Sequence, residues 1–353
     1  MSSAQEFLYN LVTGKIKGAG GILLRGILLV LSWFYGLAVI LLSGFYRIKP
    51  RRLAAKVISV GNITLGGTGK TVLVEYLAAK LSASGKTVAV LSRGYKRDIS
   101  RSGLPGMGDE PAMLQEKLPR VKVVVDKDRV RGAGKAVGGY KADTLLLDDG
   151  MQQWRIFKDL EIVMIDAANP FGNRRMLPAG FLREPLCALR RADIFVLTKD
   201  YPGLSVDKLE ADLGKFNPRA LIVTARHAPV GFRRIGREEE FLDPGLLRGK
   251  RAAIFSGIGN PGGFRSCVEG LGISVESSFD FTDHHNYSLR EIEHIMEEAG
   301  KRGLETVITT CKDAVKIRGL EIKDLKIMVL EVKLEIVRNE TEFDRRLFKL
   351  YCF

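Results

Sequence analysis

The residues best suited to chemistry form a glycine-rich stretch, Gly61-Asn62-Ile63-Thr64-Leu65-Gly66-Gly67-Thr68-Gly69-Lys70-Thr71. An apolar, β-branched run at 57–60 precedes it, and a segment with helical spacing follows at 72–82. This order of strand, glycine-rich turn, Gly-Lys-Thr and helix is typical of the phosphate-binding loop (P-loop). Thr64 stands where the usual pattern has its first glycine, so a glycine-rich turn without a nucleotide stays open as an alternative.

Each residue type in this stretch has a physical reason to face phosphate. Glycines let backbone N–H groups crowd around phosphate oxygens, and a helix N-terminus adds favourable partial charge. We expect Lys70 to reach the outer phosphates and Thr71 to ligate Mg²⁺. The predicted nucleotide contacts are Gly66, Gly67, Thr68, Gly69, Lys70 and Thr71.

Two further segments carry carboxylates in informative places. Asp148 and Asp149 end the apolar run 145–147, as in the Walker B arrangement that holds Mg²⁺, although Asp-Asp-Gly also makes a good turn. Asp109 and Glu110 precede a proline, which commonly opens a helix. The functional alternative is a carboxylate near the transferred phosphoryl group, where it accepts the proton of a hydroxyl nucleophile.

Three other segments are weaker candidates. Asp283-His284-His285 holds the only adjacent histidines; at most one is expected to enter a site, and a solvated turn is the alternative. The arginines between Asn173 and Pro185 could clamp phosphate or simply be solvated. Lys312-Asp313 follows a predicted strand and is expected to start a helix, where a structural role and an approach to nucleotide or acceptor are both open.

Composition sets broad limits on the class of protein. The chain has 353 residues, enough for one large or two modest domains, and its charged content is ordinary for a folded protein. The four scattered cysteines form no C-x-x-C pair, which argues against a zinc site or a disulfide framework. Residues 1–56 carry half of the net charge of +14.

The segment 26–46 lies within this basic region and contains no charged residue. Its length equals the roughly 20 residues needed to span a bilayer as a helix. Trp33, Phe34 and Tyr35 lie at its middle, however, rather than at its ends. A span, a helix in the interface and a helix buried against the domain are all open. We favour membrane contact, with basic residues meeting anionic headgroups.

Strand-like and helix-like segments alternate after residue 56. Apolar runs at 87–91, 121–125, 144–147, 160–165 and 193–197 predict a mostly parallel sheet covered by helices on both faces. A second set of strands is predicted at 220–223, 252–255, 305–309 and 327–332, with a helix at 289–300. We therefore expect an α/β P-loop fold with a basic, apolar N-terminal helix (1–50), a kinase-like core (51–217) and a smaller α/β lobe (218–353).

Together these motifs resemble the tetraacyldisaccharide 4′-kinase family. The likeness includes Ser92-Arg93-Gly94-Tyr95, Gly108-Asp109-Glu110-Pro111, Asp148-Asp149-Gly150-Met151-Gln152, Leu182-Arg183-Glu184-Pro185, Asp283-His284-His285 and Lys312-Asp313-Ala314. The resemblance implies transfer of the γ-phosphoryl group of ATP to the 4′-hydroxyl of an acylated glucosamine disaccharide 1-phosphate, giving lipid IVA in lipid A biosynthesis. It also implies an enzyme at the cytoplasmic face of the bacterial inner membrane, bound to the lipid surface, with ATP and Mg²⁺.

The resemblance also implies roles for particular residues. Lys70 is catalytic, and Asp109 matches the family's base, supported by His284 in preference to His285. The implied metal set is Thr71, Asp148, Asp149 and Glu184. Gln152 and Arg183 match acceptor-side or supporting positions. The chain departs from the family at Met151 and Gln153, where an aromatic residue and a histidine are usual, so a role for an imidazole at 153 is in doubt.

Three other classes of protein share some of these features. A membrane-associated regulatory P-loop ATPase of the deviant Walker type would have lysine where this chain has Leu65. A GTPase would need aspartate where this chain has Tyr201. Nucleic-acid binding has no recognition motif to support it, and we expect no nucleic-acid partner. No obligate protein partner is evident from the sequence.

Overall fold

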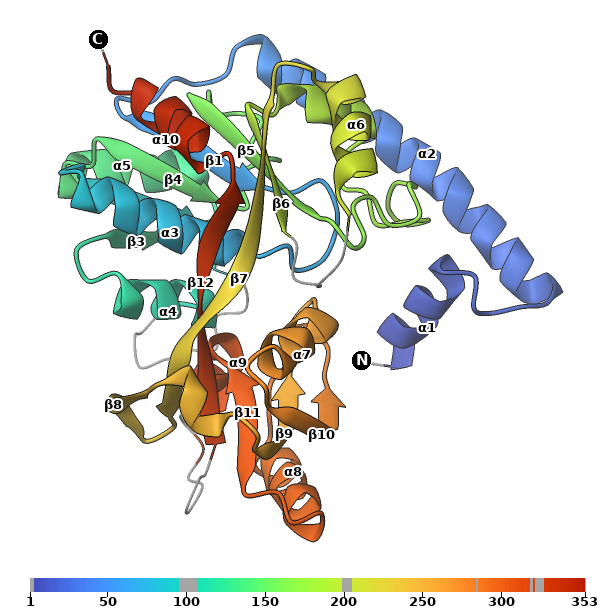
Figure 1. Cartoon of the computed structure of the whole chain (residues 1–353). Coiled ribbons are helices and arrows are strands. Elements are labelled where there is room, and N and C mark those ends of the chain that lie inside the picture. The colour runs from blue at the N-terminus through green and yellow to red at the C-terminus, as the bar shows by residue number, and fades with distance from the viewer. Residues whose placement is uncertain are drawn as a thin grey trace.

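The computed structural model describes residues 3–94, 107–198, 205–283, 285–317, 320 and 327–352. One sheet runs through the two lobes of the molecule, in the strand order β10-β9-β11-β12-β7-β6-β5-β1-β4-β2-β3, with β8 paired to β7 (Figure 1). The first lobe carries the P-loop, the second lobe carries most of the C-terminal third, and two long strands join them.

The first lobe is a parallel sheet whose strands are almost entirely buried, because helices cover both faces. Its strands are β1 (Lys56–Gly61), β2 (Val88–Ser92), β3 (Lys122–Val125), β4 (Thr144–Asp148), β5 (Leu160–Asp166) and β6 (Ile194–Thr198). Its helices are α3 (Lys70–Ala83), α4 (Asp109–Lys117), α5 (Arg129–Tyr140) and α6 (Asp207–Phe216), with a 3-10 turn at Leu186–Arg191. Continuous apolar runs suit such doubly covered strands, and the predicted α/β class is confirmed.

The second lobe is a smaller α/β unit on the same sheet. Its strands are β8 (Arg237–Leu242), β9 (Arg251–Ser256), β10 (Ser274–Asp280) and β11 (Thr306–Thr310). Its helices are α7 (Pro261–Glu269), α8 (Leu289–Lys301) and α9 (Cys311–Ile317), with a 3-10 turn at Pro244–Leu247. A capping box between Ser288 and Glu291 starts α8.

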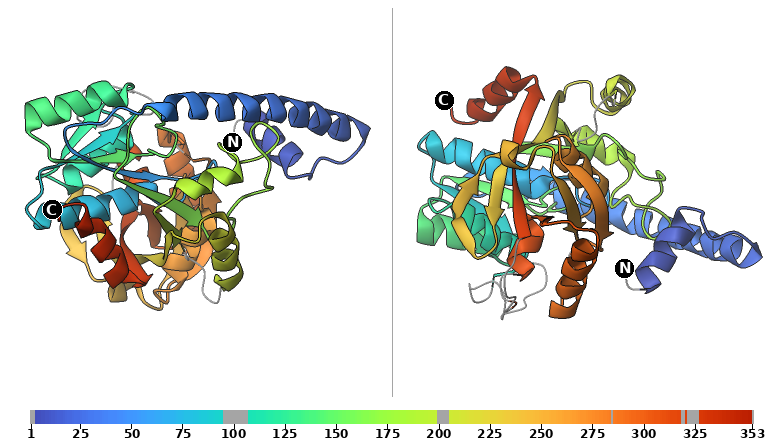
Figure 2. Two further views of the ribbon diagram at one scale, coloured as in Figure 1. Left: turned by 90° about the horizontal axis from the view of Figure 1, so that it is seen from above. Right: turned by 60° about the horizontal axis from the view of Figure 1, so that its bottom comes forward.

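The two joining strands, β7 (Leu221–Arg234) and β12 (Ile327–Arg338), are antiparallel partners over most of their length. The sequence predicted only the first part of each strand. Apolar and charged residues mix along the remainder, so the pattern of a buried strand fades there. Figure 2 shows the pair passing from one lobe to the other.

The end of the chain returns to the first lobe. Helix α10 (Glu340–Lys349) buries Phe343 and Leu347 in the same apolar cluster as the inner face of α3. Asp344 pairs with Lys80 of α3, and the Tyr351 hydroxyl lies 2.9 Å from the Thr144 hydroxyl. The division of the chain at 217/218 therefore stays a prediction, and the segment 340–351 packs with the core rather than with the second lobe.

The N-terminal region forms α1 (Ser3–Val12) and α2 (Ala19–Ile48), which extend along one side of the first lobe (Figures 1 and 2). By length and composition α2 could cross a membrane. Only a narrow face is buried, at Gly21, Ser32, Gly36 and Val39. Trp33 and Phe34 are 67% and 68% exposed. Of the three alternatives that the sequence left open, a helix buried against the domain does not match the exposed surface of α2.

We predict that Phe343→Ala lowers the free energy of unfolding by about 3–5 kcal/mol, because it opens a cavity in the cluster shared with α3. Thermal and denaturant unfolding in detergent would measure the loss. Phe241→Ala is a matched control and should cost clearly less, since Phe241 is 47% exposed. Equal losses in the two variants would contradict the packing of α10 on the core.

Candidate active site

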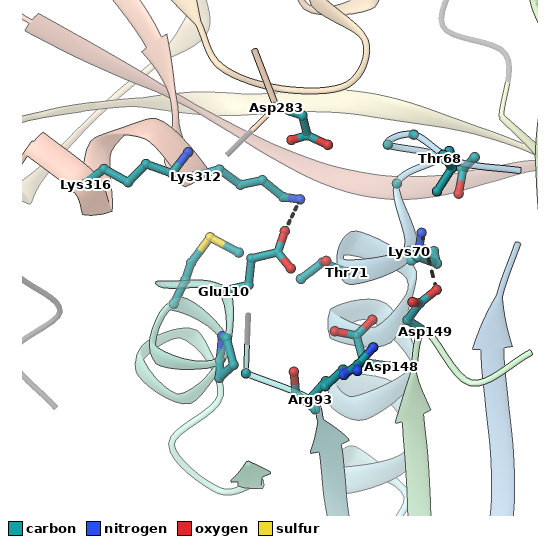
Figure 3. Close-up of a pocket in the computed structure, with 18 of the residues that line it drawn as sticks. Thr68, Lys70, Thr71, Arg93, Glu110, Asp148, Asp149, Asp283, Lys312 and Lys316 are labelled. Atoms are coloured by element: carbon teal, nitrogen blue, oxygen red, sulfur yellow. Dashed lines mark hydrogen bonds and ion pairs between the residues drawn. The ribbon is translucent and has the colours of Figure 1, made fainter. Parts of the chain in front are cut away.

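The P-loop joins the end of β1 to the first residue of α3 and forms one wall of a cavity of about 400 Å³ (Figure 3). Gly66 and Gly69 have positive φ angles of 115° and 80°, a backbone conformation that glycine adopts without strain. The Lys70 Nζ atom donates to Asn62 Oδ1 at 3.0 Å. All six predicted nucleotide contacts, 66 to 71, line the cavity.

The parallel pairing of β1 with β4 places Asp148 beside the P-loop, because Val60 is in register with Asp148. Its carboxylate lines the cavity and has no ion pair among the described residues. Burial, together with the Glu110 carboxylate, raises the pKa of Asp148 to about 6. A buried carboxylate of this kind is stabilised by a cation.

Asp149, the next residue, has a left-handed backbone with φ 55° and faces Arg183. The Arg183 guanidinium donates to both Asp149 oxygens, at 2.7 and 3.0 Å, and Lys70 Nζ lies 3.7 Å from Oδ1. Burial opposes the charge, yet the bonds from Arg183 and the charge of Lys70 hold the pKa of Asp149 below its ordinary value. Two cations therefore already pair with Asp149, whereas Asp148 has no ion pair among the residues that the structure describes.

Glu184 and Gln152 lie outside the residues that line this cavity. Glu184 is 1% exposed and accepts two bonds from Arg191, at 2.7 and 2.9 Å, and one from Gln152 Nε2 at 3.0 Å. Gln152 also donates to the Asn62 carbonyl at 3.3 Å. The expected metal role of Glu184 does not fit this geometry, because both of its oxygens are engaged by Arg191. Glu184 and Gln152 instead support the backbone at the start of the P-loop, through the bond from Gln152 to the Asn62 carbonyl.

The second lobe and α4 supply the opposite wall. Asp109 is the first residue of α4, and its side chain lies outside the described part of the structure. Its neighbour Glu110 pairs with Lys312 of α9, and Lys312 lies between Glu110 and Asp283 in Figure 3.

His284, the predicted supporting histidine, also lies outside the described residues. The neighbouring His285 does not line the cavity. Its Nε2 atom lies 3.0 Å from Glu291 Oε1, and its ring stacks on Phe281 at a centroid distance of 4.6 Å. His285 is thus occupied by contacts at the start of α8.

The structure adds cavity residues that the predicted set left out. Arg93 follows β2, and Arg129 begins α5 after β3. Arg129 is 3% exposed and donates to the Asp126 carbonyl at 2.7 Å, while its Nε atom has no hydrogen-bond partner in the described part of the chain. Because both residues follow carboxyl ends of parallel strands, strand position is the signal that could have found them.

The oxygen groups in the cavity suit Mg²⁺ better than a metal held by protein alone. No group of three or more His, Cys, Asp or Glu side chains is placed to hold a metal within the described residues. Mg²⁺ is commonly held by one or two carboxylates together with substrate phosphates and water. Asp148, with Thr71 in the same cavity, provides such a partial set.

A second, smaller cavity of about 150 Å³ lies on another side of the P-loop, against β12 and α7. The loops of the two lobes touch here: a Cβ atom placed on Gly259 would lie 2.3 Å from the Gly67 nitrogen. Its lining is mainly apolar and includes Met113, Ile258 and Phe264. The P-loop therefore separates a polar cavity from an apolar one.

Comparisons with known proteins agree with these features. The profile of the family described as tetraacyldisaccharide-1-P 4′-kinase matches residues 24–351. A tetraacyldisaccharide 4′-kinase from Halothermothrix orenii is 33% identical over 371 residues, with 94% of each chain covered. A protein of the same name from Geobacter sulfurreducens is 37% identical over 331 residues, covering 89% of this chain and 90% of its own.

A solved structure gives the same comparison in three dimensions. The "apo" form of LpxK from Aquifex aeolicus in complex with ATP shares 30% sequence identity with this chain and superposes with a TM-score of 0.69. The match covers 93% of this chain and 100% of the other. This likeness extends over both lobes and the joining strands.

We predict that Asp148→Asn stabilises the protein when metal and nucleotide are absent. A folded-state pKa of about 6, against an ordinary 3.8, means that ionised Asp148 costs stability as pH rises through this window. At pH 7.5 the variant should be more stable by about 1–3 kcal/mol, and the gain should shrink toward pH 4. Thermal unfolding at several pH values measures this.

Asp280→Asn changes an exposed carboxylate and serves as the control. It should show no comparable gain at pH 7.5. An Asp148→Asn variant less stable than the wild type at pH 7.5 would contradict the predicted cost of the buried charge.

Proposed function

This chain belongs to the tetraacyldisaccharide-1-P 4′-kinase family, and we propose that the cavity between its lobes is the site of the family's reaction. The enzyme uses ATP to phosphorylate the 4′-hydroxyl of tetraacyldisaccharide 1-phosphate in lipid A biosynthesis. One observation carries the placement: the P-loop, Asp148 and the first turn of α4 line the same cavity. A regulatory ATPase is not favoured.

The triphosphate of ATP lies along the P-loop in this proposal. Backbone N–H groups of residues 66–71 and the start of α3 bind phosphate oxygens, and Lys70 neutralises the outer phosphates. The apolar cavity on the other side of the P-loop suits the adenine base, since glycines 67 and 69 border both cavities. Arg93 and Arg129 add positive charge where phosphate groups meet.

Asp148 and Thr71 would hold Mg²⁺ with the phosphates, and the ion would neutralise charge that develops on the transferred group. Asp149 contributes indirectly in this proposal, because Arg183 and Lys70 already pair with it. Arg183 is placed to meet an anionic group of either substrate. Glu184 and Gln152 hold the P-loop base instead of binding metal.

Asp109 acts as the base that accepts the proton of the 4′-hydroxyl, with His284 in support. Its place at the start of α4, next to Glu110 on the cavity wall, supports this assignment. Phosphoryl transfer depends mainly on positioning and on charge stabilisation, and a base adds to the rate when the nucleophile is a neutral hydroxyl.

The exposed apolar faces of α2 rest in the lipid of the inner membrane in this proposal, with the enzyme on the cytoplasmic side where ATP is available. Arg47 at the end of α2 and the basic residues that follow it would meet anionic headgroups. A surface-bound enzyme can take an acylated acceptor directly from the bilayer, which supports the location.

We predict that Lys70→Ala and Asp109→Ala differ in kind. Lys70→Ala should weaken ATP handling and lower turnover by about 10²–10³-fold, since it removes a charge aimed at the phosphates. Asp109→Ala should lower turnover by about 10²–10⁴-fold with ATP binding largely kept. Transfer of radiolabelled γ-phosphate to tetraacyldisaccharide 1-phosphate in micelles measures turnover. Near-normal turnover in Asp109→Ala would show that another group is the base.

We predict that deleting residues 1–46 releases the protein from vesicles that contain anionic lipid. The deletion removes α1 and nearly all of the apolar surface of α2. Co-sedimentation with vesicles measures binding independently of activity. Deleting only 1–18 leaves α2 in place and should keep the protein bound. Persistent binding of the larger deletion would point to a second anchor.

A further inference from the structure

Lys117, the last residue of α4, lies between two carboxylates outside the catalytic cavity. Its Nζ atom is 3.0 Å from Glu331 Oε2 and 3.4 Å from both oxygens of Glu75. Arg233 Nε lies 3.4 Å from the other oxygen of Glu331. We call these four residues the Lys117 cluster. It balances two positive against two negative charges.

The members of the Lys117 cluster come from different parts of the molecule. Glu75 is on α3, the helix that begins at the P-loop lysine. Glu331 and Arg233 are on β12 and β7, the strands that join the lobes. One ammonium group therefore ties α4 both to the nucleotide-binding helix and to the connection between the lobes.

The opposite end of α4 is held by the second lobe. Glu110, in the first turn, pairs with Lys312, and α4 packs against α9. A helix of nine residues is short enough to move as a rigid rod. With ion pairs near both of its ends, its direction is set by α3, the joining strands and α9 together.

We propose that Lys117 is a positioning residue for phosphoryl transfer, which fixes the direction of α4 and so the place of Asp109 relative to the P-loop. This inference rests on the proposed role of Asp109 as the base. Among the residues that the structure describes, Lys117 and Glu75 line the apolar cavity but not the polar one. In this proposal the effect of Lys117 on the reaction passes along α4, and the KM for ATP separates that effect from a direct effect on nucleotide in the apolar cavity.

The partial burial of the Lys117 cluster strengthens its ion pairs. The side chains of Lys117, Glu75 and Glu331 are 22%, 24% and 18% exposed. Burial opposes the charge of Lys117, yet the neighbouring carboxylates hold the pKa of its ammonium above the ordinary value. Removing the ammonium leaves the partly buried carboxylates of α3 and β12 to repel each other, and α4 loses the ion pairs that tie its end to both elements.

A double-mutant cycle tests the inference. Lys117→Met should lower kcat by about 10- to 100-fold, because small misplacements of a reacting group can cost this much. The KM for ATP should change by less than about twofold. In the Asp109→Ala background the same substitution should change kcat by less than about twofold, since there is no base left to misplace.

Two companion variants separate positioning from loss of fold. Lys117→Arg keeps both ion pairs and should recover most of the lost kcat. Glu331→Gln removes the charge on β12 while keeping a polar group, and it replaces Lys117→Met in the cycle if that variant does not fold. Lys301→Met breaks an exposed pair with Glu298 and should leave kcat unchanged.

Four results would overturn the inference. The first is a Lys117→Met variant that retains kcat. The second is an effect of Lys117→Met that multiplies with that of Asp109→Ala, which would show that Lys117 acts on something other than Asp109. A rise in the KM for ATP larger than the fall in kcat would assign Lys117 to nucleotide binding in the neighbouring apolar cavity. Near-normal kcat in Asp109→Ala alone would instead refute the base, and with it any action of Lys117 through that residue.

Discussion

The antiparallel pairing of β7 with β12 is the constraint on which the rest of this structure depends. Near its start β7 pairs with β6 of the first lobe, and near its start β12 pairs with β11 of the second. Between those ends the two strands pair mainly with each other. A two-stranded ribbon is twisted and marginally stable by itself. The relation of the lobes therefore also depends on direct contacts, namely Gly67 against Gly259, Glu110 with Lys312, and Lys117 with Glu331.

The two neighbouring carboxylates of the active site, Asp148 and Asp149, have different partners. Asp149 is paired with protein cations, whereas Asp148 is buried without an ion pair among the described residues. A protein that binds anionic phosphates must hold positive charge ready, yet it must also leave one carboxylate for the cation that accompanies ATP. Keeping Asp148 unpaired costs stability, and in the proposed reaction it leaves a ligand for that cation. The buried hydrogen-bond network of Glu184, Gln152 and Arg191 supports the P-loop from beneath. The residues that line the cavity therefore remain available to ligands.

The N-terminal helix also reaches the active site, although its surface faces outward. Ser32 donates to the Met176 carbonyl at 2.9 Å, and the Tyr35 hydroxyl donates to the Arg183 carbonyl at 3.1 Å. The segment 181–183 in turn pairs with the P-loop, through Leu65 N to Phe181 O and Arg183 N to Ile63 O. One backbone segment, 181–183, thus connects the apolar helix α2 to the P-loop. In the proposed function this connection keeps the site close to the surface from which the acylated acceptor is taken.

The sequence by itself determined the P-loop, the strand-end carboxylates, the parallel core and the apolar helix, because these depend on local pattern: glycine spacing, continuous apolar runs and an uncharged stretch of membrane length. It did not determine the full length of β7 and β12, the return of α10 to the first lobe, or the true partner of Glu184, because these depend on which distant segments meet. Glu184 follows Arg183 in sequence, yet one side chain faces the cavity and the other is buried beneath it. Likewise, nothing near Lys117 in the sequence reveals Glu75 or Glu331. Only the tertiary structure brings these carboxylates within 3.4 Å of the Lys117 ammonium. Partial burial then makes the loss of either ion pair costly.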